Sequence, residues 1–377
     1  MMKKLRVMTI LGTRPEIIRL SEVIKRLDAE FDHILVHTGQ NYDYELNQIF
    51  FEELGLRAPD YYLAVVGKNL GETMGSVIAK SYDLIQELKP DAVLILGDTN
   101  SALSAIAAKR LKTPIFHMEA GNRCWDWNVA EMTNRTIVDH ISDVNMPYSE
   151  FAYNNLMREG LSPRRTFKTG SPMLEVIEAH RKEIESSDVL ERLGLEKGKY
   201  IVMSAHREEN VDIPAKFQRL YPSLNKIADE YGMPVVFSVH PRTRKRFEKE
   251  GFQLSKNIRD DKPFGFFDYC QLQKNAYVVL SDSGTLTEES SIFDFPAVLI
   301  RTSTERQEGE LHGSIVVGGV DYESIDRAIK KAREIHAPGN GLSIVPDYDV
   351  KDVSKKVADI IREYVDVVNR ETWLKEE

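Results

Sequence analysis

The chain has 377 residues, 42% of them hydrophobic and 29% charged, with a net charge of −9, which is typical of a globular protein long enough for two domains. The acidic charge argues against nucleic acid and anionic lipid surfaces as partners, and no segment approaches the roughly 20 apolar residues that a membrane span needs. The first apolar run meets Arg14 and Glu16 too early for a signal peptide, and two cysteines are too few for a secreted disulfide framework, so we expect a cytoplasmic protein with free thiols.

Short apolar runs alternate with longer amphipathic segments through the N-terminal half. Strands are predicted at 5–11, 33–37, 92–96, 114–118 and 144–147, and helices at 15–29, 44–54, 71–88, 101–111 and 131–141. Continuous apolar strands between helices indicate a parallel sheet covered on both faces.

The same alternation restarts after a charged, loosely periodic stretch at 170–199. Further strands are predicted at 200–204, 234–239, 276–281 and 297–300, and an amphipathic helix at 350–364. We therefore expect two similar α/β domains with their boundary in this stretch. Ligands of such sheets bind at the carboxyl ends of the strands.

The first polar cluster is GTRPE at 12–16, after the first predicted strand. A glycine before a helix start would suit a phosphate. The alternative is a plain turn capped by Thr13, with Arg14 solvated. No G-x-G-x-x-G occurs in this half, so a bound dinucleotide is not expected.

Two more clusters follow strands in the first half. Asp98 comes directly after strand 92–96, where Asp98 or Thr99 would otherwise serve as a helix N-cap. The stretch HMEAGNRCWDWNVAEMTNR at 117–135 begins at another strand end, with Glu119, and gathers several ionisable groups. Glu131 and Arg135 within it share a face of the predicted helix, as a functional pair or as an ordinary surface salt bridge.

The second half repeats the arrangement. His206 and Arg207 follow its first strand, and His240-Pro241-Arg242 follows the next. The strongest motif is SDSGTLTEES at 281–290, a small-residue turn before a helix whose N–H groups would hold a phosphate. Only one of its two glutamates would accept the hydroxyls of a ribose, and the alternative is simply a capped helix. TER at 304–306 adds a cation.

Together these clusters predict a nucleoside diphosphate on the second domain, surrounded by cations from both domains, with carboxylates of the first domain facing the attached group. No Cys/His pattern has the spacing of zinc ligands, and no Walker-type motif occurs. We therefore expect neither a metal nor a cofactor.

The motifs resemble the non-hydrolysing UDP-N-acetylglucosamine 2-epimerase family, in order from about residue 5 to residue 320. They are GTRPE (12–16), GDTNS (97–101), HMEAGNR (117–123), EMTNR (131–135), SAHREEN (204–210), HPR (240–242), SDSGTLTEESS (281–291) and TER (304–306). Within the family, HTGQNYDYELN (37–47), AGNRC (120–124), SAHREEN and KPFGFFDY (262–269) are more similar to the UDP-N-acetyl-L-fucosamine synthase branch. That branch inverts C2 of UDP-2-acetamido-2,6-dideoxy-L-talose for surface polysaccharide such as capsule or O-antigen.

The resemblance implies an α/β protein of two Rossmann-like domains facing a cleft, of the GT-B type. Residues 1–170 would carry the sugar-side acid/base residues, residues 171–350 would bind UDP, and residues 351–377 would form a helix returning to the first domain. It also implies a homodimer and no nicotinamide.

The family mechanism breaks the C1–O bond, so that UDP leaves while a carboxylate takes the C2 proton. A bound glycal then receives a proton on the opposite face and UDP adds back. The resemblance implies that Asp98, Glu119 and Glu131 are the acid/base set, supported by Arg135 and His206. The residues implied to hold the substrate through UDP are Arg14, His240, Ser283, Gly284, Glu289 and Arg306, with Glu289 on the ribose.

The chain departs from the branch at Asn128, Ala130 and Met132, where arginine, proline and a second glutamate are usual, and at Gln307, where proline is usual. These departures keep UDP-N-acetylglucosamine open as the substrate. Two other readings remain: a GT-B glycosyltransferase, which needs no carboxylates around C2, and a UDP-sugar-binding protein without turnover.

Overall fold

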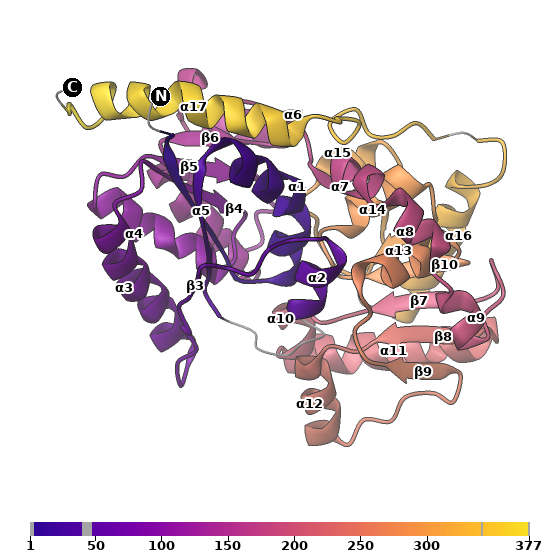
Figure 1. Cartoon of the computed structure of the whole chain (residues 1–377). Coiled ribbons are helices and arrows are strands. Elements are labelled where there is room, and N and C mark those ends of the chain that lie inside the picture. The colour runs from indigo at the N-terminus through magenta and orange to yellow at the C-terminus, as the bar shows by residue number, and fades with distance from the viewer. Residues whose placement is uncertain (1–3, 40–46, 341, 376–377) are drawn as a thin grey trace. The chain divides into compact units, whose positions relative to one another are not determined.

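A computed structural model describes residues 4–39, 47–340 and 342–375. Its internal contacts divide the chain into two compact units, each built on its own parallel six-stranded sheet (Figure 1). The first unit is Met1–Arg123, Ala130–Ala179 and Asp347–Glu377, and the second is Cys124–Val129 and His180–Pro346.

The sheet of the first unit has the order β3-β2-β1-β4-β5-β6. Its strands are β1 (Arg6–Leu11), β2 (Asp32–His37), β3 (Tyr61–Tyr62), β4 (Ala92–Leu96), β5 (Ile115–Met118) and β6 (Val144–Met146). β1 lies in the middle, where Val7 pairs with His33 of β2 and Ala92 of β4. β1 and β4 are almost wholly apolar and buried, as strands covered on both faces must be.

Helices cover this sheet because each has an apolar stripe. They are α1 (Arg14–Glu30), α2 (Gln48–Glu53), α3 (Leu70–Leu88), α4 (Ser104–Arg110), α5 (Glu131–Ile141), α6 (Glu150–Arg158), α7 (Met173–Ala179) and α17 (Val353–Glu371), with short 3-10 turns η2 (Asn100–Leu103) and η3 (Pro163–Arg165). α17, the last helix, packs against α1, and so does α7, which lies beyond the expected boundary at residue 170 (Figure 1).

The sheet of the second unit has the order β12-β11-β10-β7-β8-β9. Its strands are β7 (Ile201–Ser204), β8 (Val235–Ser238), β9 (Ile258–Asp261), β10 (Val278–Ser281), β11 (Ala297–Leu299) and β12 (Val316–Val317). Its helices are α8 (Arg181–Ser186), α9 (Val189–Leu193), α10 (Glu208–Val211), α11 (Pro214–Tyr231), α12 (Pro241–Glu250), α13 (Phe266–Lys274), α14 (Leu286–Phe293), α15 (Gln307–Leu311) and α16 (Tyr322–Ile335).

Several elements differ from the sequence-based prediction. β3 and β12 have two residues each, and β9 reads Ile-Arg-Asp-Asp, so none of the three forms an apolar run. The helix predicted at 44–54 is observed as α2, and residues 44–46 lie outside the described residues. Most of the motif at 37–47 also lies outside the described residues. The helix predicted at 101–111 is a 3-10 turn followed by α4.

The carboxyl ends of parallel strands meet at one edge of each sheet. In the first unit this edge carries the segments that follow β1, β4 and β5, and in the second unit it carries those that follow β7, β8, β10 and β11. Nearly all of the polar motifs singled out in the sequence fall on these segments. Among the helices of the described chain, none is both long and apolar enough to span a bilayer.

Candidate active site

Asp98, directly after β4, pairs with Arg135 of α5. The Arg135 Nε donates to Asp98 Oδ2 at 2.9 Å, and Nη2 donates to the same oxygen. The Arg135 side chain is 4% exposed and that of Asp98 is 20% exposed, so a buried guanidinium holds a carboxylate that reaches the surface. The N-cap role left open in the sequence belongs to Thr99, whose hydroxyl accepts from Ser101 N–H at 3.2 Å.

Glu119, directly after β5, lies beside the same turn. A Cβ atom on Gly97 would stand 3.4 Å from Glu119 Oε2, in ordinary contact, so the Glu119 carboxylate reaches the turn that carries Asp98. Glu119 pairs with Arg19 of α1, which is 6% exposed. It has a φ of +61°, a strained value for a side chain of this kind. The fold therefore brings the two predicted carboxylates together, each with its own arginine.

Glu131 and Arg14 are the other predicted site residues of this unit. Glu131 is the first residue of α5, one turn before Arg135, and is partly exposed. Arg14 is the first residue of α1, at the edge of the sheet where β1 ends, and its guanidinium lies 5.8 Å from the centre of the Phe50 ring. Both side chains thus come from helix starts at this edge.

A buried charge network supports the segment after β5. Asp139 of α5 is fully buried and lies 3.0 Å from His117 Nδ1 and 2.7 Å from Arg123 Nη1. Burial alone would raise the pKa of Asp139, but hydrogen bonds and charge from His117 and Arg123 outweigh it and lower the pKa. The same carboxylate accepts from Gly121 N–H at 3.1 and 3.2 Å. Asp139 of α5 therefore fixes the segment that carries Glu119.

Glu16 of the GTRPE motif is a second buried carboxyl group, 1% exposed. Its Oε2 accepts from Gly12 N–H at 3.1 Å and from the Thr13 hydroxyl at 2.8 Å. Thr13 therefore does not cap α1 with its side chain, contrary to the plain-turn alternative. Burial raises the pKa of Glu16 to about 7, although these hydrogen bonds and one with the Thr99 side chain oppose the increase.

In the second unit, His206 and Asp282 meet where β7 and β10 end. Asp282 is fully buried, and its Oδ2 accepts from the backbone N–H groups of His206 and Arg207, both at 2.9 Å. The His206 ring stacks on that of His240, with ring centres 5.5 Å apart. His240 is the N-cap of α12, and its Nδ1 accepts from Arg242 N–H at 3.2 Å. Both predicted histidines therefore lie side by side.

Gly284 and Ser283 form the turn before α14. A Cβ on Gly284 would lie 3.3 Å from Glu305 Oε1, 3.6 Å from Arg207 Nη2 and 3.8 Å from Arg306 Nε, so the backbone here faces two guanidinium groups and one carboxylate. Arg207 also donates from Nη2 to Glu305 at 3.2 Å. The Ser283 N–H donates to Ser281 Oγ at 3.1 Å, and the two arginines beside this glycine turn are the groups suited to a diphosphate.

The two glutamates of α14 have different partners. Glu289 Oε2 accepts from Gln273 Nε2 at 2.7 Å, whereas Glu288 pairs with Arg306 at 3.3 Å. Both carboxylates are buried within α14.

Sequence reasoning missed Arg19 and Arg301 as members of these clusters, and it named Arg207, Asp282 and Glu305 only as parts of motifs, without a site role. Arg301 is 3% exposed and lies within 3.4 Å of Glu209 and 2.8 Å of Glu305. Arg19 sits among Ile17, Ile18 and Leu20 on α1, and a cation inside such an apolar run was the one signal that would have found it.

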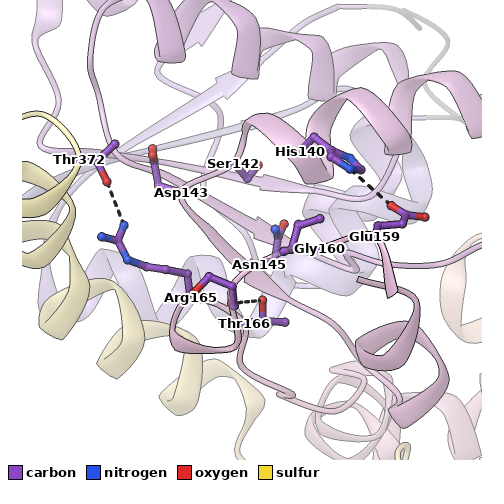
Figure 2. Close-up of a pocket in the computed structure, with 11 residues that line it drawn as sticks. His140, Ser142, Asp143, Asn145, Glu159, Gly160, Arg165, Thr166 and Thr372 are labelled. Carbon is purple, nitrogen blue, oxygen red and sulfur yellow. Dashed lines mark hydrogen bonds and ion pairs between the residues drawn. The ribbon is translucent and has the colours of Figure 1, made fainter. Parts of the chain in front are cut away.

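A separate pocket of about 360 Å³ lies in the first unit (Figure 2). Its lining includes His140, which faces Glu159 at 3.7 Å, and Arg165, which donates to the Thr372 hydroxyl at 3.1 Å. His140 is near the end of α5 and Glu131 is at its start, roughly 14 Å away along the helix. The pocket is thus at the opposite edge of the sheet from Asp98. Across residues 4–39, 47–340 and 342–375, no group of three or more His, Cys, Asp or Glu side chains is arranged to hold a metal ion.

Comparisons with known proteins show the family and the fold of the chain. A family model described as UDP-N-acetylglucosamine 2-epimerase matches residues 25–362. The solved structure of a UDP-N-acetylglucosamine 2-epimerase from Rickettsia bellii is 48% identical with a TM-score of 0.91, covering 99% of this chain and 100% of that one. The Methanocaldococcus jannaschii UDP-GlcNAc 2-epimerase, solved in complex with UDP-GlcNAc and UDP, is 31% identical with a TM-score of 0.89, covering 95% of this chain and 100% of that one.

A Pseudomonas aeruginosa relative, named UDP-2,3-diacetamido-2,3-dideoxy-D-glucuronate 2-epimerase, is 32% identical over 361 residues, which is 92% of this chain and 100% of that protein. The names of these relatives therefore share one reaction, inversion at C2, and differ in the sugar. The two parallel-sheet units of the chain match their GT-B-like fold, and the predicted fold class is confirmed.

Proposed function

The chain belongs to the UDP-N-acetylglucosamine 2-epimerase family of isomerases, and we propose that it inverts C2 of a UDP-2-acetamido sugar by elimination and re-addition of UDP. The observation that carries this proposal is the pair of carboxylates, Asp98 and Glu119, beside Gly97. A glycosyltransferase has no need of two carboxylates beside one another at this position.

The carboxylates of the first unit would do the proton chemistry. Asp98, Glu119 and Glu131 form the acid/base set, because C2 must lose a proton from one face of the sugar and gain one on the other. Arg135 holds Asp98 in place and Arg19 holds Glu119. Partial exposure of Asp98 leaves this carboxylate open to a substrate.

The second unit would hold UDP and stabilise it as a leaving group. The turn at Ser283 and Gly284 would face the diphosphate, Arg207 and Arg306 would supply charge, and Glu289 would take the ribose hydroxyls. His206 and His240 would lie at the phosphate that departs. Arg14 of the first unit would add a further cation.

For the sugar we propose UDP-2-acetamido-2,6-dideoxy-L-talose, converted to UDP-N-acetyl-L-fucosamine for a surface polysaccharide such as capsule or O-antigen. Support comes from the motifs at 37–47, 120–124, 204–210 and 262–269. The departure at Met132 is compatible with catalysis, because this residue is 1% exposed and its sulfur accepts from Arg135 Nη1 at 3.6 Å. Met132 therefore supports the arginine that holds Asp98.

The second candidate is UDP-N-acetylglucosamine, converted to UDP-N-acetylmannosamine. The names of the Rickettsia bellii and Methanocaldococcus jannaschii relatives favour this substrate. The departures at Asn128 and Ala130, close to Glu131, favour it as well, since they remove a cation and a rigid residue usual in the L-fucosamine branch.

A proton NMR time course in D2O separates these substrates. Purified protein receives the deoxy-L-talose sugar nucleotide in one tube and UDP-N-acetylglucosamine in another. Loss of the C2 proton signal with a new epimer in the first tube supports the L-fucosamine assignment. The same change in the second tube alone moves the substrate to N-acetylglucosamine. Silence in both tubes, with UDP binding intact, would leave a binding protein without turnover.

We also propose that the protein works in the cytoplasm as a homodimer. Exposed apolar side chains gather on the first unit, where Tyr62, Val66 and Leu70 are 54%, 57% and 52% exposed. Such a surface is a usual site of association. Light scattering after gel filtration should give twice the mass of one chain, and Val66→Lys should reduce that mass.

A further inference from the structure

Asp282 makes two kinds of contact with the histidine segment after β7. Its Oδ2 accepts from the N–H groups of His206 and Arg207 at 2.9 Å and from Asn210 Nδ2 at 3.1 Å. Three donors on one oxygen hold the backbone of this segment. In return, Arg207 Nε donates to the Asp282 carbonyl oxygen at 3.1 Å.

The other oxygen, Oδ1, faces the imidazole. It is buried, has no hydrogen bond of normal geometry within the described residues, and lies 3.4 Å from His206 Nδ1. That distance exceeds the ~2.9 Å of a direct N–H···O bond, but contacts of this kind commonly shorten when a substrate binds. A buried carboxylate oxygen without a donor is costly, and His206 Nδ1 is the group placed to supply one.

We propose that Asp282 is the positioning residue for His206. Its Oδ2 fixes the backbone of the segment, and its Oδ1 receives the hydrogen on Nδ1 of the imidazole. This fixes the tautomer, so that Nε2 is the nitrogen that meets the substrate. The assignment rests on the proposed function for the role of His206, but the hydrogen-bond arrangement stands apart from it.

The rest of the surroundings agree with this arrangement. The His206 side chain is 27% exposed, whereas that of Asp282 is fully buried, so the Nδ1 side of the ring points inward. The Ser204 hydroxyl lies 3.5 Å from the same nitrogen, and His240 stacks on the ring face. A histidine held on one face and at one nitrogen has a fixed ring orientation and tautomer.

A double-mutant cycle tests the positioning role. Asp282→Asn should lower kcat on the order of 100-fold in the wild-type background, because an amide favours the wrong tautomer. In a His206→Gln background the same change should cost less than about threefold, since the ring that Asp282 positions is gone. Equal losses in the two backgrounds would overturn the proposal and reduce Asp282 to a backbone support.

Nitrogen-15 NMR of histidine-labelled full-length protein gives a second readout that does not need turnover. The neutral His206 ring should carry its hydrogen on Nδ1 in the wild type, and a hydrogen on Nε2 would contradict the proposal even if Asp282→Asn failed to fold. Absence of epimerisation by the wild type would defeat the proposed function and leave this NMR result standing.

The chain offers a matched control in the same unit. Asp294 Oδ1 lies 2.7 Å from His336 Nδ1, away from the strand ends that carry the site. Asp294 has a φ of +53°, a conformation that asparagine tolerates well. Asp294→Asn therefore repeats the same chemical change beside a histidine and should leave kcat unchanged.

Discussion

Arg135 donates from two guanidinium nitrogens to a single carboxylate oxygen of Asp98, and so joins the first turns of α5 to the end of β4. Because both donors meet Oδ2, the other oxygen of Asp98 takes no part in this pair. A carboxylate anchored through one oxygen has the other available for a proton of the substrate. In the proposed mechanism, this pair orients Asp98 to act as a base.

Arg135→Lys tests this orientation. Lysine keeps the charge but has a single nitrogen in place of a planar fork, so it cannot hold Asp98 in the same way. We expect kcat to fall on the order of 100-fold, with UDP affinity changed less than about threefold, because most of the residues proposed to hold UDP belong to the second unit. Epimerisation rates and calorimetric UDP binding give the two quantities.

Arg362→Lys is the matched control for that change. Arg362 on α17 makes an exposed pair with Glu30, and an exposed pair contributes at most about 1 kcal/mol to stability. The epimerisation rate of Arg362→Lys should equal that of the wild type. A comparable loss in both variants would point to a general effect of the substitution.

Arg19→Gln tests the second arginine. The Glu119 carboxylate would lose the buried cation beside it, and we expect kcat to fall about 10- to 100-fold with a lower melting temperature. Arg26→Gln, on the same helix but 40% exposed, should change neither. If Arg19→Gln retained full activity, Glu119 would need no partner to act, and its assignment to the acid/base set would weaken.

These two arginines show where sequence reasoning succeeds and where it stops. Asp98 and Glu119 were predictable because each follows a continuous apolar strand, and parallel strands end at one edge. Their partners were not. Arg19 precedes Glu119 by 100 positions, so its apolar neighbours in the sequence indicate burial but do not indicate which carboxylate it meets.

Asp282 also shows a contact that the sequence alone does not predict. The turn at 281–285 was identified as a phosphate site, yet the bonds of Asp282 to residues 75 and 76 positions upstream depend on β7 and β10 being neighbours in the sheet. Strand order is a property of the whole domain, because short strands of similar composition pair in many orders. The edge strands β9 and β12 were missed because β9 is mostly charged and β12 has only two residues.

Gly284→Ala tests the proposed diphosphate site. The added methyl would lie 3.3 Å from Glu305 Oε1, which a side chain can accommodate, so the melting temperature should change little. It would also cover the backbone that a phosphate approaches. We expect UDP affinity to fall about 10-fold, or roughly 1.4 kcal/mol, measured by calorimetry.

Gly75→Ala, on the exposed side of α3, is the control for that substitution. A Cβ there meets nothing within 4 Å, and alanine is favoured over glycine in a helix by about 1 kcal/mol. This variant should be slightly more stable and bind UDP normally. Unchanged UDP binding by Gly284→Ala would move the diphosphate away from this turn.

Glu16→Gln should change how stability depends on pH. Burial raises the pKa of Glu16 to about 7 in the folded chain, from an ordinary value of 4.5. The folded state then holds the proton more tightly than the unfolded state, so the contribution is full below pH 4.5 and is lost as pH rises toward 7. The size of this loss is on the order of 3 kcal/mol, from about 1.4 kcal/mol for each pH unit between the two values.

Glutamine stays neutral at every pH and still offers an oxygen to Gly12 N–H and the Thr13 hydroxyl. Urea unfolding of wild type and variant at pH 5 and pH 8 should therefore show similar stability at the lower pH and a more stable variant at the higher one. An equal difference at both pH values would mean that Glu16 does not titrate between them. Glu16 joins the turn of Arg14 to the Thr99 side chain, which is next to Asp98 in the sequence. If Glu16→Gln gained stability but lost epimerisation at pH 8, the charge of Glu16 would support activity at a cost in stability.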